Sequence, residues 1–295
     1  MTSPLPTDIM PVIAERMKMN TLLFGTAGNP HSSKPPHSTV EGIKRIAELG
    51  LDSLEIEFVR GVNIGEVSAR QIAQVALNRN IKLSVHAPYF INLNAHEPEK
   101  MKASQVRLIQ AARAAALCGA GDVAFHPAFY LGDPLEKVYE TVKNSLLEVR
   151  EQLDKDGIKV RLRPELMGKA SQFGALNEVL RLASEIPRVA PCIDFAHWHA
   201  RTGAFNSYDE FATVLSQIKE RLGAPALKEM HIHVAGIAYG KSGEKNHLDL
   251  RDSDFAYREL LQALRDFKAG GLVICESPNL EEDALLLKRA FVELK

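Results

Sequence analysis

The chain has 295 residues, of which 45% are hydrophobic, and its formal net charge is −1. This apolar content is enough for one sizeable core, and the near-zero charge gives no overall basic excess that would announce nucleic-acid binding, although local charge placement matters more than the sum. No apolar run reaches about 18 residues, so no membrane span is expected, and the three separated cysteines lack CxxC spacing, which suits a reducing cytoplasm.

The predicted elements begin after residues 1–20, which lack the apolar core of a signal peptide and are expected to be a partly disordered lead-in. From there a short β-rich run alternates with a helical stretch, eight times in all. The predicted strands cover residues 21–27, 53–59, 82–88, 122–127, 159–166, 189–196, 229–235 and 271–277. In the helical stretches, apolar residues recur at three and four positions, which gives each helix one buried face. Glycine stands where four helices should stop, at Gly50, Gly119, Gly157 and Gly223.

Strict alternation of strand and helix predicts parallel strands joined by crossover helices. Eight such units in about 275 residues fit a single closed (β/α)8 barrel, a TIM barrel of the α/β class with its helices outside. The competing architecture is a doubly wound open sheet, which would carry a GxGxxG loop after an early strand, and no such loop occurs. We therefore expect residues 21–295 to form one barrel domain.

Histidines and acidic residues stand at the carboxyl ends of six successive predicted strands, the end at which (β/α)8 barrels carry out their chemistry. In chain order they are His86, His126, Glu165, Asp194 with His197, the pair His231 and His233, His247 in the loop that follows, and Glu276. His231 and His233 share one face of their strand because strand side chains alternate.

One histidine or glutamate at a strand end is usually a hydrogen-bonded or ion-paired rim residue. So many at one barrel mouth are costly to bury unless they are paired or bind a cation, and a site for several metal ions removes that cost in one step. Nitrogen and oxygen ligands suit Zn²⁺, Mn, Fe or Co without choosing among them. Cys192 and Cys275 lie within strand bodies and are expected in the core, and His199 is either an outer partner or an exposed residue.

Seven short motifs occur in an order and at separations that are specific together, although each is weak alone. They are HAPYFINL (86–93), FHP (125–127), PELMGKASQFG (164–174), CIDFAH (192–197), MHIH (230–233), KNHLDL (245–250) and ICESP (274–278). On these motifs the chain, from about residue 21 to its end, resembles endonuclease IV, the metal-dependent AP endonuclease family within the xylose-isomerase-like barrel superfamily. FGTAGNP, EFVRG and SVHAPYFINL resemble its archaeal members in particular.

The resemblance implies a cluster of two or three zinc ions and a residue-by-residue set of ligands. These ligands would be His86, His126, Glu165, Asp194, His197, His231, His247 and Glu276. Glu165 would bridge two ions and be the catalytic carboxylate beside the attacking hydroxide. The resemblance further implies that Tyr89 and Phe90 enter the DNA at the lesion and that Arg60 fills the gap in the base stack.

The chain departs from the family pattern at three places. Lys245 occupies the position of an aspartate ligand two residues before the loop histidine, and the adjacent Glu244 is a candidate substitute. His233 stands where the family usually has asparagine or another polar residue, and is either an extra ligand or a substrate contact. LDLRDSD replaces the glycine-rich LGEG after His247. One metal position, and with it the substrate, is therefore open.

The function implied by the resemblance is hydrolysis of the DNA phosphodiester 5′ to an abasic site in base excision repair, by a monomer acting on double-stranded DNA. The competing enzyme is a sugar isomerase or epimerase on the same barrel, which needs one or two metals held by strands five to eight and does not explain His86 and His126. A third interpretation is a lesion-binding protein with little cleavage, if the lost ligand empties one metal position.

Overall fold

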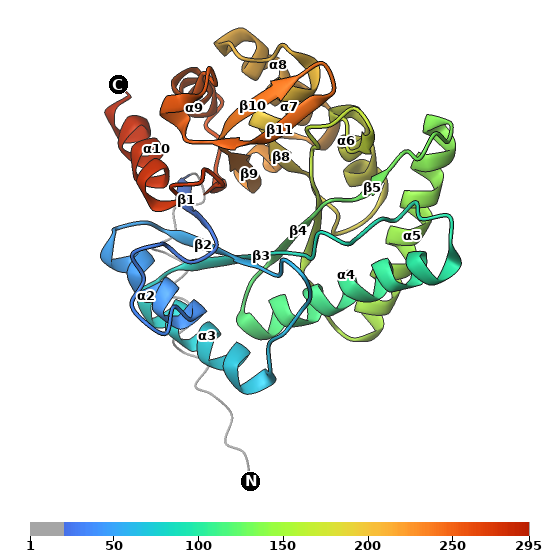
Figure 1. The fold of residues 1–295 in the computed structure, drawn as a ribbon, viewed down its shortest axis with the longest axis horizontal. Helices are drawn as coiled ribbons and strands as arrows, with labels where there is room; N and C mark the ends of the chain where they lie inside the picture. Colours follow the sequence, from blue (N-terminus) through green and yellow to red (C-terminus); the bar gives the residue numbers. More distant parts are fainter. Residues whose placement is uncertain (1–20, 295) are drawn as a thin grey trace.

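The fold is known from a computed structural model that describes residues 21–294 (Figure 1). The lead-in expected over residues 1–20 lies outside the described residues. The barrel strands are β1 (Leu22–Ala27), β2 (Ser53–Glu57), β3 (Lys82–His86), β4 (Asp122–Phe125), β6 (Arg161–Pro164), β8 (Cys192–Asp194), β9 (Met230–Val234) and β12 (Gly271–Cys275). Each falls within one of the predicted strands, and the predicted (β/α)8 barrel is confirmed.

All neighbouring barrel strands pair in parallel, in the order β6-β4-β3-β2-β1-β12-β9-β8. Two isolated parallel bridges, Leu162 with Val189 and Glu165 with Cys192, link β6 to β8 and bring the two ends of the sheet together. Because every strand runs in the same direction, the carboxyl ends of all eight meet at one mouth.

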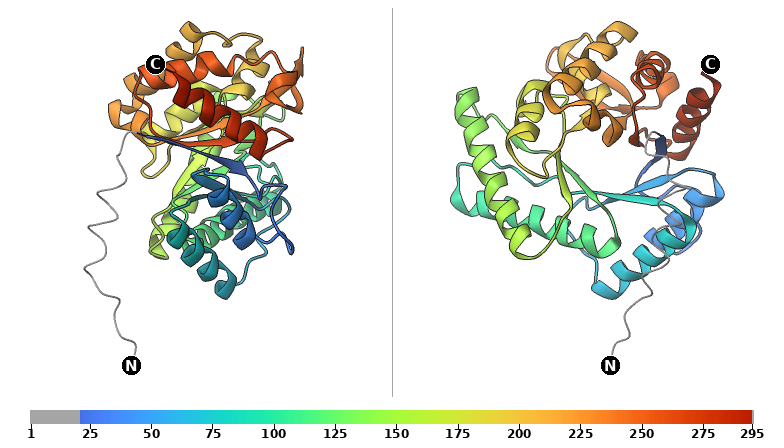
Figure 2. Two further views of the ribbon diagram at one scale, coloured as in Figure 1. Left: turned by 90° about the vertical axis from the view of Figure 1, so that its left-hand side faces the viewer. Right: turned by 180° about the vertical axis from the view of Figure 1, so that it is seen from behind.

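The helices form the outer layer around the barrel in all three views (Figures 1 and 2). They are α2 (Thr39–Glu48), α3 (Glu66–Arg79), α4 (Pro98–Cys118), α5 (Leu135–Lys155), α6 (Leu176–Glu185), α7 (Phe195–Thr202), α8 (Tyr208–Leu222), α9 (Tyr257–Asp266) and α10 (Glu281–Glu293), with short 3₁₀ turns η1 (Ala224–Lys228) and η2 (Leu250–Asp252). Gly119 ends α4 in the left-handed conformation with a φ of 75°, as its position predicts. Within residues 21–294, no helix has the length and apolarity of a bilayer-spanning segment.

Two small antiparallel pairs lie outside the barrel. One joins β5 (Ala128–Phe129) to β7 (Gln172–Phe173), and the other is a hairpin of β10 (Gly236–Gly240) and β11 (Gly243–Leu248). The sequence predicts a loop for the segment that carries His247, whereas in the structure this segment forms the hairpin. Gly243 allows the hairpin to approach the loop after β6, because a Cβ there would lie 2.2 Å from the Gly168 carbonyl oxygen.

Candidate metal centre

Three groups of potential metal ligands meet at the mouth of the barrel. The first consists of His86, His126 and Glu165, the second of Asp194, His197 and His247, and the third of Glu165, Asp194, His233 and Glu276. Within each group, one ligand atom per residue lies within 4.8 Å of the others. Because Glu165 and Asp194 each belong to two groups, the three groups form one continuous cluster. The structure thus brings together seven of the eight predicted ligands and adds His233.

The ends of the strands deliver these side chains. His86 and Asp194 are the last residues of β3 and β8, and Glu165 follows β6 by one residue. The Asp194 carboxylate also caps α7, accepting from the backbone N–H of His197 at 2.7 Å. This cap holds the first turn of the helix against the strand end, so that His197 lies beside the aspartate in space as well as in sequence.

Three of the histidines are oriented by backbone carbonyls. Nδ1 of His86 lies 2.8 Å from the Ala87 oxygen, Nδ1 of His197 lies 3.1 Å from the Leu166 oxygen, and Nδ1 of His247 lies 3.2 Å from the Glu276 oxygen. An Nδ1–H that donates to a carbonyl leaves the Nε2 lone pair free to bind a cation. Nε2 of His197 and Nε2 of His247 then face each other at 3.2 Å. Two such lone pairs repel each other unless a proton or a metal ion lies between them.

Each of three mouth carboxylates keeps one buried oxygen without a hydrogen bond in the described residues. Glu165 is fully buried, with Oε2 3.1 Å from His86 Nε2 and 3.3 Å from His126 Nε2. Glu165 Oε1, Asp194 Oδ2 and Glu276 Oε2 are buried without a hydrogen bond in the described residues. Buried oxygens of this kind are costly unless a cation meets them. The residues present therefore fit a site for metal ions.

The pKa values at the mouth reflect this surplus of negative charge. Burial raises the pKa of Asp194 to about 7, against the opposing charge of His197. Burial favours a neutral His86, but Glu57 and Glu165 outweigh it and raise the pKa of this histidine to about 10. The mouth thus draws positive charge to itself, which a divalent cation would also supply.

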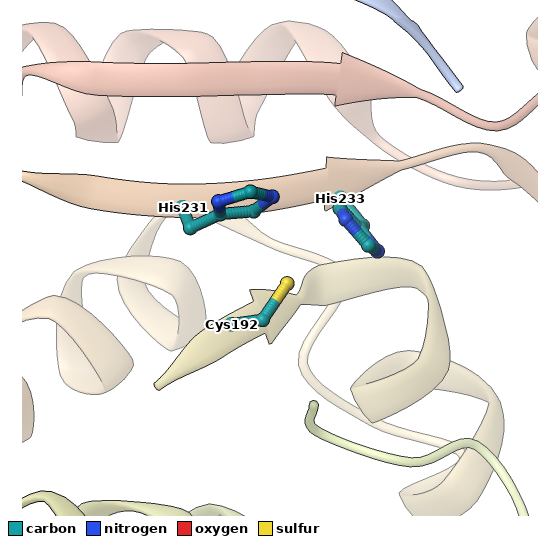
Figure 3. A group of neighbouring side chains, drawn as sticks. All are labelled: Cys192, His231 and His233. Carbon is teal, nitrogen blue, oxygen red and sulfur yellow. The ribbon is translucent and has the colours of Figure 1, made fainter. Parts of the chain in front are cut away.

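The structure separates the two histidines of β9. His233 reaches the mouth, where its Nδ1 lies 3.4 Å from Glu276 Oε1 and 3.5 Å from Glu165 Oε1. His231 precedes it by two residues and lies deeper in the barrel, in a group with Cys192 and His233 (Figure 3). His231, which the resemblance implies as a mouth ligand, is thus in none of the three mouth groups.

Two acidic residues of the barrel interior, Glu55 and Glu57, were not predicted from the sequence. Glu55 is fully buried, with its carboxylate 2.8 Å from His231 Nε2 and 2.9 Å from His233 Nε2. Glu57 is paired in register with His86, and burial raises its pKa to about 8 despite the charge of that histidine. Their spacing in SLEIEFV was the available clue, because residues two apart in a strand point to the same face.

The hairpin β10–β11 presents Glu244 to the mouth and Lys245 to solvent. Glu244 Oε2 lies 3.6 Å from His197 Nε2, and the Glu244 backbone N–H donates to the Gly168 oxygen at 3.0 Å. Lys245 is exposed. The substitute ligand considered from the sequence is therefore within reach of the cluster.

Exposed side chains border the mouth on the side of β2 and β3. Tyr89 and Phe90 are 48% and 62% exposed, and the Tyr89 ring lies 5.4 Å from the His126 ring. The Tyr89 backbone N–H donates to the Val59 oxygen at 3.3 Å, which brings exposed Arg60 to the same rim. His199 lies outside the cluster, with Nδ1 2.9 Å from the Ala204 oxygen and its ring against Tyr239.

A hollow of about 460 Å³ opens at the opposite, amino-terminal end of the barrel. Its lining includes Arg161, Arg163, Met230 and His231. None of the residues of the three mouth groups lines it. The candidate metal centre is therefore identified by its converging polar atoms, several of which have no hydrogen bond in the described residues, and not by this hollow.

Comparison with known sequences gives a family and several relatives. The profile of the family described as xylose isomerase-like TIM barrel matches residues 43–291. The uncharacterized protein MJ0133 of Methanocaldococcus jannaschii is 43% identical over 274 residues, which cover 92% of this chain and 98% of that protein. The probable endonuclease 4 of Shouchella clausii is 26% identical over 154 residues, about half of either chain at 50% and 51%.

Comparison with solved structures shows the same barrel in proteins of different activities. Endonuclease IV from Thermus thermophilus aligns with a TM-score of 0.70 and 20% identity, covering 90% of this chain and 97% of that chain. A D-tagatose 3-epimerase-like protein aligns with a TM-score of 0.67 and 18% identity, covering 86% and 94%. At these identities the likeness concerns the fold, and it does not choose between the two chemistries.

Proposed function

We propose that this chain, which belongs to the xylose isomerase-like TIM barrel family, is a metal-dependent phosphodiesterase that cuts DNA 5′ to an abasic site. The observation that carries the proposal is the group of His86 and His126 around Glu165, which adjoins the ligands of the last four barrel strands. A single-metal site has no use for this extra group. A site for two or three ions, with zinc the first choice, uses all of it.

Divalent ions held at the mouth would supply the activated water and the charge stabilisation that phosphodiester hydrolysis requires. The chain's own residues would hold the ions in place and would take up or release protons. Glu165 Oε2 faces the ring nitrogens of His86 and His126, and Glu165 also belongs to the group of Asp194, His233 and Glu276, so this carboxylate can contribute to two positions at once. Glu57, with a pKa of about 8 and an Oε1 that is buried without a hydrogen bond in the described residues, can hold or release a proton near neutral pH.

The exposed rim supports a nucleic-acid substrate. An abasic nucleotide leaves the helix at low cost because it has no base to unstack. Tyr89 and Phe90 are placed beside the mouth and are free to stack against the bases that flank the gap. Arg60 lies on the same rim, where its positive charge suits the phosphate backbone, and this local placement outweighs the net charge of −1.

The competing function is isomerisation or epimerisation of a sugar. One observation favours it, because Glu165, Asp194, His233 and Glu276 come from the last four barrel strands and form a complete ligand group by themselves. An enzyme of that kind would leave His86, His126 and His247 without a role. We therefore place it second.

The test is incision of a DNA duplex that carries one abasic-site analogue, with an intact duplex of the same sequence as the control. Purified protein of measured metal content is incubated with each duplex, with and without a chelator. We expect chelator-sensitive cleavage on the 5′ side of the lesion in the abasic duplex alone. If protein that holds at least two ions per chain leaves this duplex intact, the proposal is wrong, and turnover of a ketohexose in a parallel assay would establish the competing function.

A further inference from the structure

A second set of metal-binding side chains lies inside the barrel, below the mouth. It consists of Glu55 on β2, Cys192 on β8, and His231 and His233 on β9, and every one of these residues is fully buried. Figure 3 shows that Cys192 and the two imidazoles approach one another from adjacent strands. The Cys192 Sγ and one nitrogen from each ring lie within 4.8 Å of one another.

Most polar atoms of this set lie close together without a hydrogen bond in the described residues, and the exception is Glu55 Oε2, which accepts from Ser84 Oγ at 2.7 Å. Neither ring nitrogen of His231 or His233 forms a hydrogen bond in the described residues, and Glu55 Oε1 forms none. The carboxylate nevertheless lies 2.8 Å from His231 Nε2 and 2.9 Å from His233 Nε2. The directions required for hydrogen bonds are missing, so hydrogen bonding within the set leaves these atoms unsatisfied. A cation held among them would meet the lone pairs of both rings and the carboxylate.

We propose that Glu55, Cys192, His231 and His233 form a second metal site, separate from the mouth, that holds one zinc-class ion. One carboxylate, one thiolate and two imidazoles supply the four ligands that zinc takes in a tetrahedral arrangement. Four protein ligands in a fully buried setting leave no open position for water or substrate, so this ion is structural. The site gives His231 a role that its absence from the mouth groups leaves open.

The inner ion would have its own entrance. The hollow of about 460 Å³ at the amino-terminal end of the barrel reaches His231, so a metal ion can approach from the side opposite the mouth. The inner ion would also influence the mouth. When Nε2 of His233 binds the ion, Nδ1–H of the same ring is left to donate toward Glu276 Oε1 at 3.4 Å and Glu165 Oε1 at 3.5 Å. His233 is then an inner ligand and not a mouth ligand. The inference therefore agrees with the proposed phosphodiesterase, which rests on His86, His126 and Glu165, and not with an epimerase that uses His233 at the mouth.

The first test replaces all bound metal with Co²⁺ and records the thiolate-to-cobalt charge-transfer band in the near ultraviolet. Cys192→Ser removes the proposed ligand. Cys275→Ser is the matched control, because Cys275 is equally buried on another barrel strand, β12, and belongs to none of the ligand groups. We expect the band in the wild type and in Cys275→Ser. We expect Cys192→Ser to lack the band and to bind one ion fewer per chain than the wild type. A wild type that shows no band in excess Co²⁺, or a band that persists in Cys192→Ser, overturns the proposal.

A second measurement needs no variant and remains decisive if Cys192→Ser does not fold. X-ray absorption of the wild-type zinc protein should contain a sulfur shell at about 2.3 Å in addition to nitrogen and oxygen. A spectrum with nitrogen and oxygen alone means that Glu55, Cys192 and the two histidines form a metal-free polar cluster. Incision of abasic DNA by protein without a sulfur shell would refute the inner site and leave the phosphodiesterase proposal standing. A sulfur shell in protein that does not cut abasic DNA would support the inner site and refute the phosphodiesterase proposal.

Discussion

The two ends of the barrel bury charge in different ways. At the amino-terminal end, the Asp122 carboxylate is bound by Arg161 at 2.8 Å and by Arg163 at 2.7 Å. Arg163 also donates to the Pro191 and Glu229 carbonyls, at 3.2 Å and 2.8 Å. Although burial opposes it, the two arginines hold the pKa of Asp122 well below its usual range. Arg161 also forms an ion pair with the Glu229 carboxylate, so each charge of this group has a partner of opposite charge within the chain.

The mouth also buries carboxylates, but no arginine in its ligand groups neutralises them. Glu165, Asp194 and Glu276 each keep one buried oxygen without a hydrogen bond in the part of the chain that the structure describes. Burial therefore dominates the pKa of Asp194 and raises it to about 7. Burial of charged groups therefore does not by itself indicate a functional site. A buried charge that has no neutralising partner within the chain does indicate one, because a ligand can then neutralise it.

Glu165→Gln tests the mouth and should have the largest effect. Loss of the carboxylate shared by two ligand groups should remove at least one bound ion and lower incision of abasic DNA by at least about 10²–10³-fold, as the loss of one charge-stabilising group does elsewhere. Metal content and single-turnover rate are the measurements. Glu151→Gln, on the exposed surface, is the control and should behave as wild type. A near-normal rate and full metal content in Glu165→Gln would remove this residue from the centre.

Asp122→Ala tests the opposite end. Removal of one partner from a buried ion pair leaves Arg163 uncompensated and should lower the free energy of unfolding by about 3–5 kcal/mol. Urea denaturation measures this loss. Incision at low temperature should not change, because Asp122, Arg161 and Arg163 belong to none of the three mouth groups. A loss below about 1 kcal/mol would place Asp122 among ordinary surface charges and would remove the contrast between the two ends.

Tyr89→Ala asks whether the rim belongs to the site. Loss of one aromatic stacking surface costs about 1–3 kcal/mol, so binding of the abasic duplex should weaken roughly tenfold while metal content is unchanged. Fluorescence titration with labelled duplex measures the affinity, and Val67→Ala, at an 84% exposed apolar position on α3, is the control. Equal affinity in the wild type and in Tyr89→Ala would refute the wedge role.

The smallest expected effect is the acid dependence of stability that Asp122 contributes. Its pKa is lower in the folded chain than in the unfolded chain, so its stabilisation is present above the unfolded value of about 4 and is lost as the pH falls through the folded value. Asp122→Asn should therefore show a flatter loss of stability below about pH 4 than the wild type. Parallel acid limbs in the two proteins would contradict the assigned pKa shift.

The barrel was predictable because each strand carries β-rich residues and each helix carries an apolar stripe, so local pattern and global fold agree. The depth at which a side chain lies along the barrel axis was not predictable. His231 and His233 share a face, and the approximately 6.6 Å along the strand that separates them decides which one reaches the mouth. A strand's pattern indicates a face and gives no level.

Glu55 was missed for a related reason. In SLEIEFV the acids alternate with apolar residues, which is typical of a strand with one solvated face. In this barrel Leu54 and Ile56 belong to the hydrophobic core, while Glu55 belongs to the polar interior. The hairpin β10–β11 was missed because its polar, glycine-containing sequence GIAYGKSGEKNHL resembles that of a loop.

That hairpin has a consequence for how such an enzyme can change. Glu244 and His247 both stand on β11, outside the eight strands that hold Glu165, Asp194 and Glu276. Exchange of residues 236–248 would therefore remove or replace one ligand group and leave the barrel's own set untouched. In the proposed centre, the number of ions would depend on this exchangeable segment. A lineage could thus move between chemistries by altering one hairpin, provided that Ile237, which packs in the hydrophobic core, is kept.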